Sequence, residues 1–395
     1  MMGFYAHTGN IPNMNRNIPN IFNDAEVGWR CSARQTCFLW LVPLMMGMAR
    51  RLLKNVLMKN LCSIKLFSAA TLMYYCLILL STQAVAIEVQ KSERAGAKLQ
   101  VGFLYMLANF SGPIPSQWAR IDYDQQNNEI ITLNPRSNEV QIFNREGMEL
   151  YAFGDNGEIV RLRDIAAGDG GTIYGLSMNF RDNGIQVFNY RGEPEPSVFL
   201  KEFPAEWANF YADRMEYQDD KFYLLDSKAM LFAVVSTDGT FMQMHDVGKR
   251  LWAVVEEKDP EKKKITEIDI SGFNIDNQGN LYFTSPLISS AFRLSLDGTL
   301  IPFGRSGSGP GKFGVVSGIA VDERGNIYVA DRLRSVVMIF DPDFIFQGEF
   351  GYRGGREEDM LVPDDLVVDQ QGDRIFVSQA ANKGVGAYRV ILTTR

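Results

Sequence analysis

Histidine and cysteine are nearly absent from most of this 395-residue chain. The four cysteines (Cys31, Cys37, Cys62 and Cys76) all lie before residue 87, and the two histidines are His7 and His245. Residues 87–395 therefore cannot build a Cys/His zinc site, a haem attachment motif, a thiol nucleophile or a disulfide framework. A serine nucleophile would lack a histidine base, because we expect His245 to be a surface residue just after an outer strand.

The N-terminal residues divide into an irregular part and a part with a targeting pattern. Residues 58–65 are basic, residues 66–80 form an apolar run, and Ala84-Val-Ala86 supplies the small-x-small pattern of a cleavage site. This order predicts a signal peptide over 58–86, cleaved near Ala86, with an uncleaved anchor helix as the alternative. The protein is then extracytoplasmic, either periplasmic or secreted, and of a bacterial type. We interpret residues 1–57 as a non-native or disordered extension.

Acidic residues outnumber basic ones in the remainder of the chain. Residues 87–395 hold 32 Lys and Arg against 45 Asp and Glu, a net charge of about −13. Nucleic-acid binding relies on a cationic surface that releases counterions, so this balance argues against a nucleic-acid partner. We also expect no membrane insertion after signal cleavage.

One pattern of short strands returns six times after residue 87. Each copy contains a hydrophobic pair flanked by turn residues: Ile130-Ile131, Ile173-Tyr174, Phe222-Tyr223, Leu281-Tyr282, Ile327-Tyr328 and Ile375-Phe376. The pairs recur at intervals of about 43 to 59 residues, a period typical of propeller blades. Twofold alternation between Gly-, Asn- and Asp-rich turns indicates antiparallel strands. The sequence therefore predicts an all-β, six-bladed β-propeller of four-stranded antiparallel blades over residues 87–395.

The two ends of the repeat region predict how the ring closes. The sixth unit stops before a fourth strand, and an unassigned apolar segment, Leu99–Leu107, precedes the first unit. We expect this N-terminal strand to pair with the last unit, which removes an exposed sheet edge. No long stretch after residue 87 has a convincing helical period, and the charged residues 256–264 are expected to form a solvated insertion.

The fifth and sixth units resemble the NHL-repeat propellers. The resemblance is carried by the Gly-rich link Ser306–Phe313, by Gly318-Ile-Ala-Val-Asp322 and by Gly325-Asn-Ile-Tyr-Val-Ala-Asp331, with a looser copy in the sixth unit. Units one to four keep the strands and turns but not the motif residues. The resemblance implies the propeller fold; it implies no particular activity, because members of this family do many different things.

The two faces of such a disc differ in composition. The turns between the first and second and between the third and fourth strands share one face, here named the turn face, which is rich in Asp. The second-to-third loops and the links between blades share the other, the loop face, which gathers arginine and lysine. The candidate binding residues on the loop face are Arg332, Arg334, Arg353, Arg356, Arg305, Lys312 and Arg181. A focused positive field there would suit a protein or anionic partner; ordinary turn formers and solvated arginines are the alternative explanation.

Catalytic and metal sites receive little support from the sequence. Asp213, Asp269, Asn274 and Asp365 are candidate channel ligands for calcium, but no repeated spacing indicates a cage. Aromatic and apolar residues in two blade links (Trp207, Phe210, Tyr211, Leu251 and Trp252) are expected to pack between blades. We therefore predict a non-catalytic binding or scaffold propeller without a cofactor, with a calcium-dependent hydrolase or lactonase as the alternative.

Overall fold

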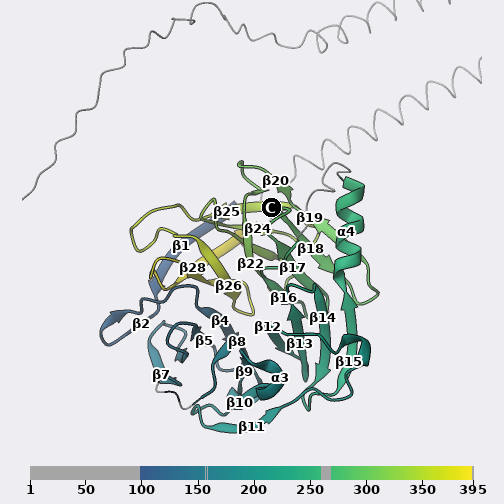
Figure 1. Ribbon diagram of the computed structural model, residues 1–395. Coiled ribbons are helices and arrows are strands. Elements are labelled where there is room, and N and C mark those ends of the chain that lie inside the picture. Colours follow the sequence, from purple (N-terminus) through teal and green to yellow (C-terminus); the bar gives the residue numbers. More distant parts are fainter. Residues whose placement is uncertain (1–97, 156, 158, 259–267, 394–395) are drawn as a thin grey trace, which may run out of the picture. The chain divides into compact units, whose positions relative to one another are not determined.

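The computed structural model describes residues 98–393 apart from 156, 158 and 259–267. These residues belong to one unit, Val89–Arg395, and the predicted segments 1–57 and 58–86 lie outside the described residues. Six antiparallel sheets of four strands are arranged in a ring (Figure 1). The predicted all-β, six-bladed propeller is confirmed.

Blades 1 to 5 each consist of four strands that follow one another in the chain. Blade 1 contains β4 (Arg120–Asp124), β5 (Glu129–Asn134), β6 (Glu139–Phe143) and β7 (Glu149–Phe153). Blade 2 contains β8 (Leu162–Ala167), β9 (Ile173–Ser177), β10 (Ile185–Phe188) and β11 (Pro194–Val198). Blade 3 contains β12 (Arg214–Gln218), β13 (Lys221–Asp226), β14 (Leu231–Ser236) and β15 (Phe241–Asp246).

The remaining blades complete the ring. Blade 4 contains β16 (Phe273–Ile275), β17 (Leu281–Ser285), β18 (Ser290–Leu294) and β19 (Leu300–Phe303). Blade 5 contains β22 (Val316–Val321), β23 (Ile327–Asp331), β24 (Val336–Phe340) and β25 (Phe346–Phe350). Blade 6 contains β26 (Pro363–Val368), β27 (Arg374–Gln379), β28 (Val385–Thr393) and the N-terminal strand β1 (Lys98–Met106).

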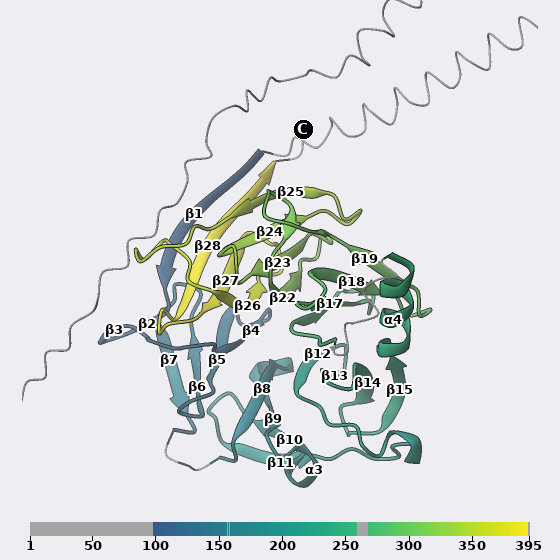
Figure 2. The same cartoon turned by 45° about the horizontal axis from the view of Figure 1, so that its top comes forward.

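Blade 6 joins the two ends of the described chain. Strand β1 runs antiparallel to β28 from the pair Lys98 and Thr393 to the pair Met106 and Gly386, with one irregularity between Phe103 and Tyr105. The two strands lie side by side in Figure 2. The predicted closure by an N-terminal strand is therefore confirmed, and it supplies the fourth strand that the last repeat lacks.

Hydrophobic side chains fill the spaces between neighbouring blades. Six buried clusters are present among the described residues, and each takes its residues from two consecutive blades. The cluster between blades 6 and 1, for example, joins Phe376 and Val385 to Ile121 and Phe143. Each blade thus buries its apolar faces only against its neighbours, as expected of a repeat architecture.

Short elements lie in the loops of blade 2 and in the links between blades. They are β2 (Ala108–Asn109), β3 (Gly112–Pro113), β20 (Arg305–Ser306), β21 (Lys312–Phe313), the 3-10 helices η1 (Asp169–Gly171) and η2 (Ala205–Trp207), and the helices α3 (Phe180–Asn183) and α4 (Val247–Lys258). No helix among the described residues is long and apolar enough to span a bilayer.

Two sequence expectations are corrected by this part of the fold. Helix α4 forms where no helical period was recognised, because Val247 and Leu251, four residues apart, are both fully buried on one side of it. His245 lies within the outer strand β15 and is only 6% exposed, so it is not a surface residue. The packing role expected of the link residues is confirmed for Phe210, Leu251 and Trp252, which join inter-blade clusters.

Candidate functional site

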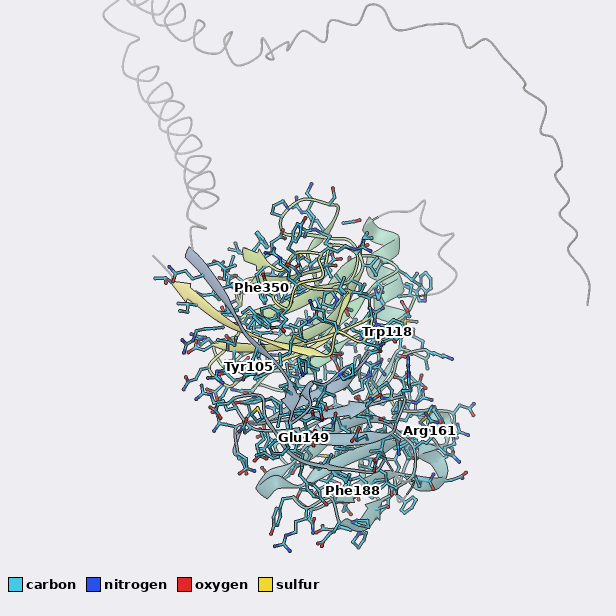
Figure 3. The ribbon with its side chains drawn as sticks, turned by 90° about the vertical axis from the view of Figure 1, so that its left-hand side faces the viewer. Tyr105, Trp118, Glu149, Arg161, Phe188 and Phe350 are labelled. Atoms are coloured by element: carbon cyan, nitrogen blue, oxygen red, sulfur yellow. The ribbon has the colours of Figure 1, made fainter. Side chains whose placement is uncertain are left out.

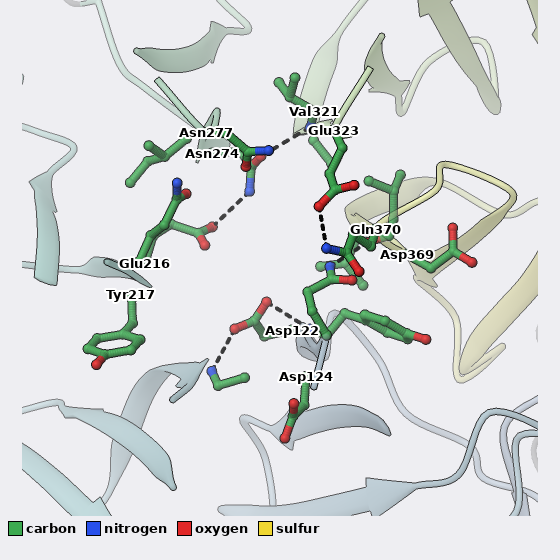
Figure 4. A pocket seen from close by; sticks show the side chains of 18 of the residues that line it. Asp122, Asp124, Glu216, Tyr217, Asn274, Asn277, Val321, Glu323, Asp369 and Gln370 are labelled. Carbon is green, nitrogen blue, oxygen red and sulfur yellow. Dashed lines mark hydrogen bonds between the residues drawn. The ribbon is translucent and has the colours of Figure 1, made fainter. Parts of the chain in front are cut away.

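The six innermost strands bring polar side chains to the centre of the ring. A cavity of about 380 Å³ opens there on the turn face. Its walls include one residue from each inner strand: Asp122, Ala167, Glu216, Asn274, Ala320 and Val367. The first-to-second turns of the blades form its rim. We name this cavity the vestibule (Figure 4).

The charge of the vestibule has a single sign. Eight carboxylates are among the residues that line it, and no Lys, Arg or His is among them: Asp122, Asp124, Asp169, Glu216, Asp219, Asp322, Glu323 and Asp369. A concave site walled by low-dielectric protein focuses the field of such groups, so the vestibule attracts cations.

Three of the six carboxylates at the rim are occupied in holding turns. Asp124 accepts hydrogen bonds from the backbone N–H groups of Gln126 and Asn127 at 2.9 and 3.0 Å. Asp322 and Asp369 accept backbone N–H groups of their own turns in the same way. These aspartates are therefore turn formers first, as the alternative interpretation of the sequence held.

Two carboxylates at the floor of the vestibule, Asp122 and Glu216, have a different role. Asp122 accepts the backbone N–H of Ala167 in the next blade at 2.6 Å. Glu216 instead receives the side-chain amide of Asn274 at 3.5 Å, and the Asn274 oxygen accepts the N–H of Val321 at 3.1 Å. Asn274 thus orients Glu216 toward the cavity, as Figure 4 shows.

The floor carboxylates hold protons more tightly than ordinary acids. Withdrawal from bulk water raises the pKa of Asp122 to about 7, and the neighbouring Asp164 and Asp365 add to the effect. Burial, followed by the charges of Asp122 and Asp164, raises the pKa of Glu216 well above its usual range. Both side chains remain partly accessible through the cavity, so a ligand can reach them.

A second layer of residues closes the channel beneath the vestibule. A cavity of only about 30 Å³ remains there, room for about one water molecule. It is lined by a second residue from each blade: Arg120, Asp164, Arg214, Gly272, Gly318 and Asp365. A Cβ on Gly272 would lie 2.5 Å from the Ser317 carbonyl oxygen, so glycine is required where these strands approach.

Opposite charges pair within this closed layer. Arg120 lies 3.8 Å from both Asp364 and Asp365, and Asp164 accepts the N–H of Met215 at 2.9 Å. Burial raises the pKa of Asp164 to about 6, and burial together with the nearby Arg120 lowers the pKa of Arg214. The layer is a structural plug, and the vestibule is reached from the turn face.

The residues considered as calcium ligands do not form a cage. Asp365 pairs with Arg120, Asp213 accepts the N–H of Ser227 at 3.3 Å, and Asp269 is exposed. Asn274 lies in the vestibule, but both ends of its side-chain amide are hydrogen-bonded. Among the described residues, no three His, Cys, Asp or Glu side chains gather as a metal site would require.

Three of the seven predicted binding residues of the loop face have carboxylate partners. Arg332, in the β23–β24 loop, donates to Asp364 at 2.9 Å. Arg334, in the same loop, donates to Glu349 at 2.9 Å. Arg356 lies 3.2 Å from Glu358 and 3.4 Å from Asp359.

The other four predicted residues are exposed. Arg353 lies in the link after β25, and Arg305 and Lys312 lie in the paired strands β20 and β21. Arg181, in α3, donates to the carbonyl oxygen of Ala208 at 3.1 Å. The seven residues are therefore spread over several loops and do not converge on one cavity among those found in the described part of the chain.

Comparisons with known proteins support the fold. No family model matches the chain. The solved structure of a Bacteroides thetaiotaomicron protein of unknown function has a TM-score of 0.52 at 13% identity, covering 75% of this chain and 76% of that one. A gluconolactonase from Xanthomonas campestris has a TM-score of 0.51 at 13% identity, covering 75% and 90%. This chain thus shares its fold with these two structures.

A match to a curated protein covers a shorter part of the chain. Protein brain tumor of Drosophila melanogaster is 33% identical over 87 residues, which are 22% of this chain and 8% of that protein. The match therefore spans a small part of both chains. The NHL-repeat assignment stays a prediction.

Proposed function

We propose that this protein is a non-catalytic extracytoplasmic binding protein that holds a small organic cation in the vestibule. The observation that carries the proposal is the lining of the cavity, which joins eight carboxylates and no basic side chain around about 380 Å³. Ligand sites in proteins commonly have volumes of several hundred Å³.

The chemistry of the floor favours an ammonium or guanidinium group. Such groups only donate hydrogen bonds, and ionised carboxylates only accept them. Glu216 has one carboxylate oxygen directed to Asn274, which leaves the other for a ligand. A charge-assisted hydrogen bond in this enclosed position is about twice as strong as a neutral one.

The proposal is tested by titrating the protein with spermidine at pH 8 in a calorimeter. Glu216→Gln keeps the shape of the floor and removes the charge that Glu216 takes on when a bound cation favours loss of its proton, and it should weaken binding at least about tenfold, because a hydrogen bond to a charged group contributes on the order of 1.5–3 kcal/mol. Glu206→Gln, the same change at an exposed position in η2, is the control and should leave the affinity unchanged.

An equal affinity of wild type and Glu216→Gln would contradict the proposal. Calcium chloride provides a second titrant. Tight stoichiometric calcium binding that abolishes the spermidine signal would favour the metal-dependent alternative.

A second candidate function, acid–base catalysis, is favoured by one observation. The pKa of Asp122 is about 7, the range of an effective general base, and Glu216 retains its proton above its usual range. Small lactones and esters are the substrates to screen. Turnover that Asp122→Asn abolishes would support hydrolysis; the binding proposal expects none.

We also propose that the propeller is exported and released by cleavage near Ala86. The basic, apolar and small-residue order of residues 58–86 supports this. Mass spectrometry of the native protein should then find Ile87 at its N-terminus, whereas an intact apolar segment would indicate an anchored protein.

A further inference from the structure

The loop face exposes three large apolar side chains on neighbouring loops. Trp118 is 48% exposed, Leu333 is 64% exposed and Tyr352 is 72% exposed. Single exposed apolar residues are normal on protein surfaces, whereas a group of them marks an interaction site. Trp118 is also held at a φ of 54°, a left-handed conformation that a bulky residue rarely adopts.

Hydrogen bonds join the loops that carry these residues. The N–H of Met360 donates to the Tyr352 carbonyl oxygen at 2.8 Å, and the N–H of Leu361 donates to the Gln379 side chain at 2.8 Å. The N–H of Trp118 donates to the backbone oxygen of the same Gln379 at 3.2 Å. The loops of Tyr352 and Trp118 therefore form one connected surface.

The loop of Leu333 borders this surface. Arg332, next to Leu333, pairs with Asp364, three residues after Leu361. The three apolar residues thus come from consecutive positions around the ring: the β23–β24 loop of blade 5, the link into blade 6 and the link into blade 1. We name them together the anchor surface.

Basic side chains flank the anchor surface. Arg136 donates to the side chain of Gln117, beside Trp118, at 3.0 Å, and exposed Arg353 follows Tyr352. Figure 3 shows Trp118 and another exposed arginine, Arg161, toward the same side of the molecule. Three acidic residues lie nearby in the same link: Glu358 and Asp359 are paired with Arg356, and Glu357 is exposed.

We propose that the anchor surface docks an acidic segment of a partner protein. Aromatic residues and arginine are the types that dominate binding energy at protein interfaces, usually as apolar anchors inside a polar rim. Here Trp118, Leu333 and Tyr352 are the anchors, and Arg136 and Arg353 supply the charge complementarity that selects an acidic partner. This surface is separate from the vestibule, which opens on the opposite face.

A fluorescent random copolymer of glutamate and tyrosine serves as the probe for the full-length chain. The double variant Tyr352→Ala/Arg353→Glu should weaken binding by tenfold or more, and Trp118→Ala should weaken it similarly. The chain offers a matched control in Tyr190 and Arg191, an exposed Tyr-Arg pair in the β10–β11 turn, on the turn face. Tyr190→Ala/Arg191→Glu should change the affinity by less than twofold.

Several outcomes would overturn the proposal. They are an absence of copolymer binding, an equal loss in the control variant, and equal binding of polyuridylate, which would show that the surface senses charge alone. Glu216→Gln should leave copolymer binding intact. A failure at the anchor surface is therefore distinguishable from a failure of spermidine binding in the vestibule.

Discussion

Individual residues of the inner strands decide what the centre of the propeller can bind. Strands β4 and β12 have matching sequences, Arg-Ile-Asp-Tyr-Asp and Arg-Met-Glu-Tyr-Gln, in which polar and apolar residues alternate. The apolar residues enter inter-blade clusters and the first two polar residues face the channel. Asp122 and Glu216 occupy the same position in these two strands.

This alternation was the signal by which sequence reasoning could have found the vestibule. Charged residues at every second position of the most enclosed strand of a blade are costly unless they serve the channel. The channel candidates taken from the sequence were Asp213, Asp269, Asn274 and Asp365, of which only Asn274 lines the vestibule. The sequence alone could not show which carboxylates are free, because Asp122 and Asp164 accept backbone N–H groups that come from the next blade, and only the assembled ring supplies these.

The raised pKa of Asp122 predicts a pH-dependent stability. An acid whose pKa is higher in the folded state adds nothing to stability below its unfolded pKa near 4, and it destabilises the fold increasingly as the pH rises toward 7. Asp122→Asn removes this penalty while keeping an oxygen for the Ala167 N–H. We expect the free energy of unfolding of the variant to exceed that of wild type at pH 8 by on the order of a few kcal/mol, so the variant should unfold at a higher temperature.

At pH 4.5 the two proteins should unfold at nearly the same temperature. The measurement is thermal unfolding by circular dichroism at both pH values. Because Glu216, Asp164 and Asp365 also have raised pKa values, wild type retains a similar trend from those groups. A difference between variant and wild type that is independent of pH would contradict the account of Asp122.

At the scale of elements, strand β1 completes blade 6 and closes the ring. The incomplete sixth repeat and the apolar segment before the first one were sufficient to predict its pairing with β28. Helix α4 was missed because Leu251 and Trp252 were interpreted as packing residues of a blade link and residues 256–258 as part of a charged insertion, the rest of which, 259–264, lies outside the described residues. Only the packing of Val247 and Leu251 between blades 3 and 4 reveals why this segment is helical.

A single substitution tests the contribution of β1. Phe103 packs against the cluster between blades 5 and 6 and meets the ring of Tyr388 edge-on at 5.7 Å. Phe103→Ala should lower the free energy of unfolding by about 3 kcal/mol, the lower end of the range for removal of a packed phenylalanine. Val101→Ala, at a more exposed position of the same strand, should cost less than about 1 kcal/mol.

Urea denaturation of the two variants provides the comparison. A loss for Phe103→Ala no larger than the small loss expected for Val101→Ala would show that β1 is an appendage and that blade 6 is stable with three strands.

At the scale of the whole molecule, the two faces of the disc present different chemistry. The turn face opens into a vestibule with only acidic charge, and the loop face exposes apolar anchors among basic residues. The channel does not connect them, because the plug formed by Arg120, Asp164, Arg214 and Asp365 leaves space for about one water molecule. A ligand in the vestibule and a partner on the loop face can therefore bind at the same time.

The repeat pattern predicted the fold and the charge difference between faces, since both depend on local strand and turn residues. The sites depend on which side chains the ring leaves without internal partners. Arg332 and Arg334 were the first choices for binding, yet in the folded chain they pair with Asp364 and Glu349. Trp118 and Tyr352 were passed over because nothing in their local sequence distinguishes an exposed aromatic residue from a buried one.

The most direct test of the central claim is to locate the bound cation. A crystal structure of the protein with spermidine is predicted to place an amine nitrogen within hydrogen-bonding distance of the Glu216 carboxylate at the floor of the vestibule. Spermidine bound only outside the vestibule, or an empty vestibule at saturating spermidine, would contradict the account.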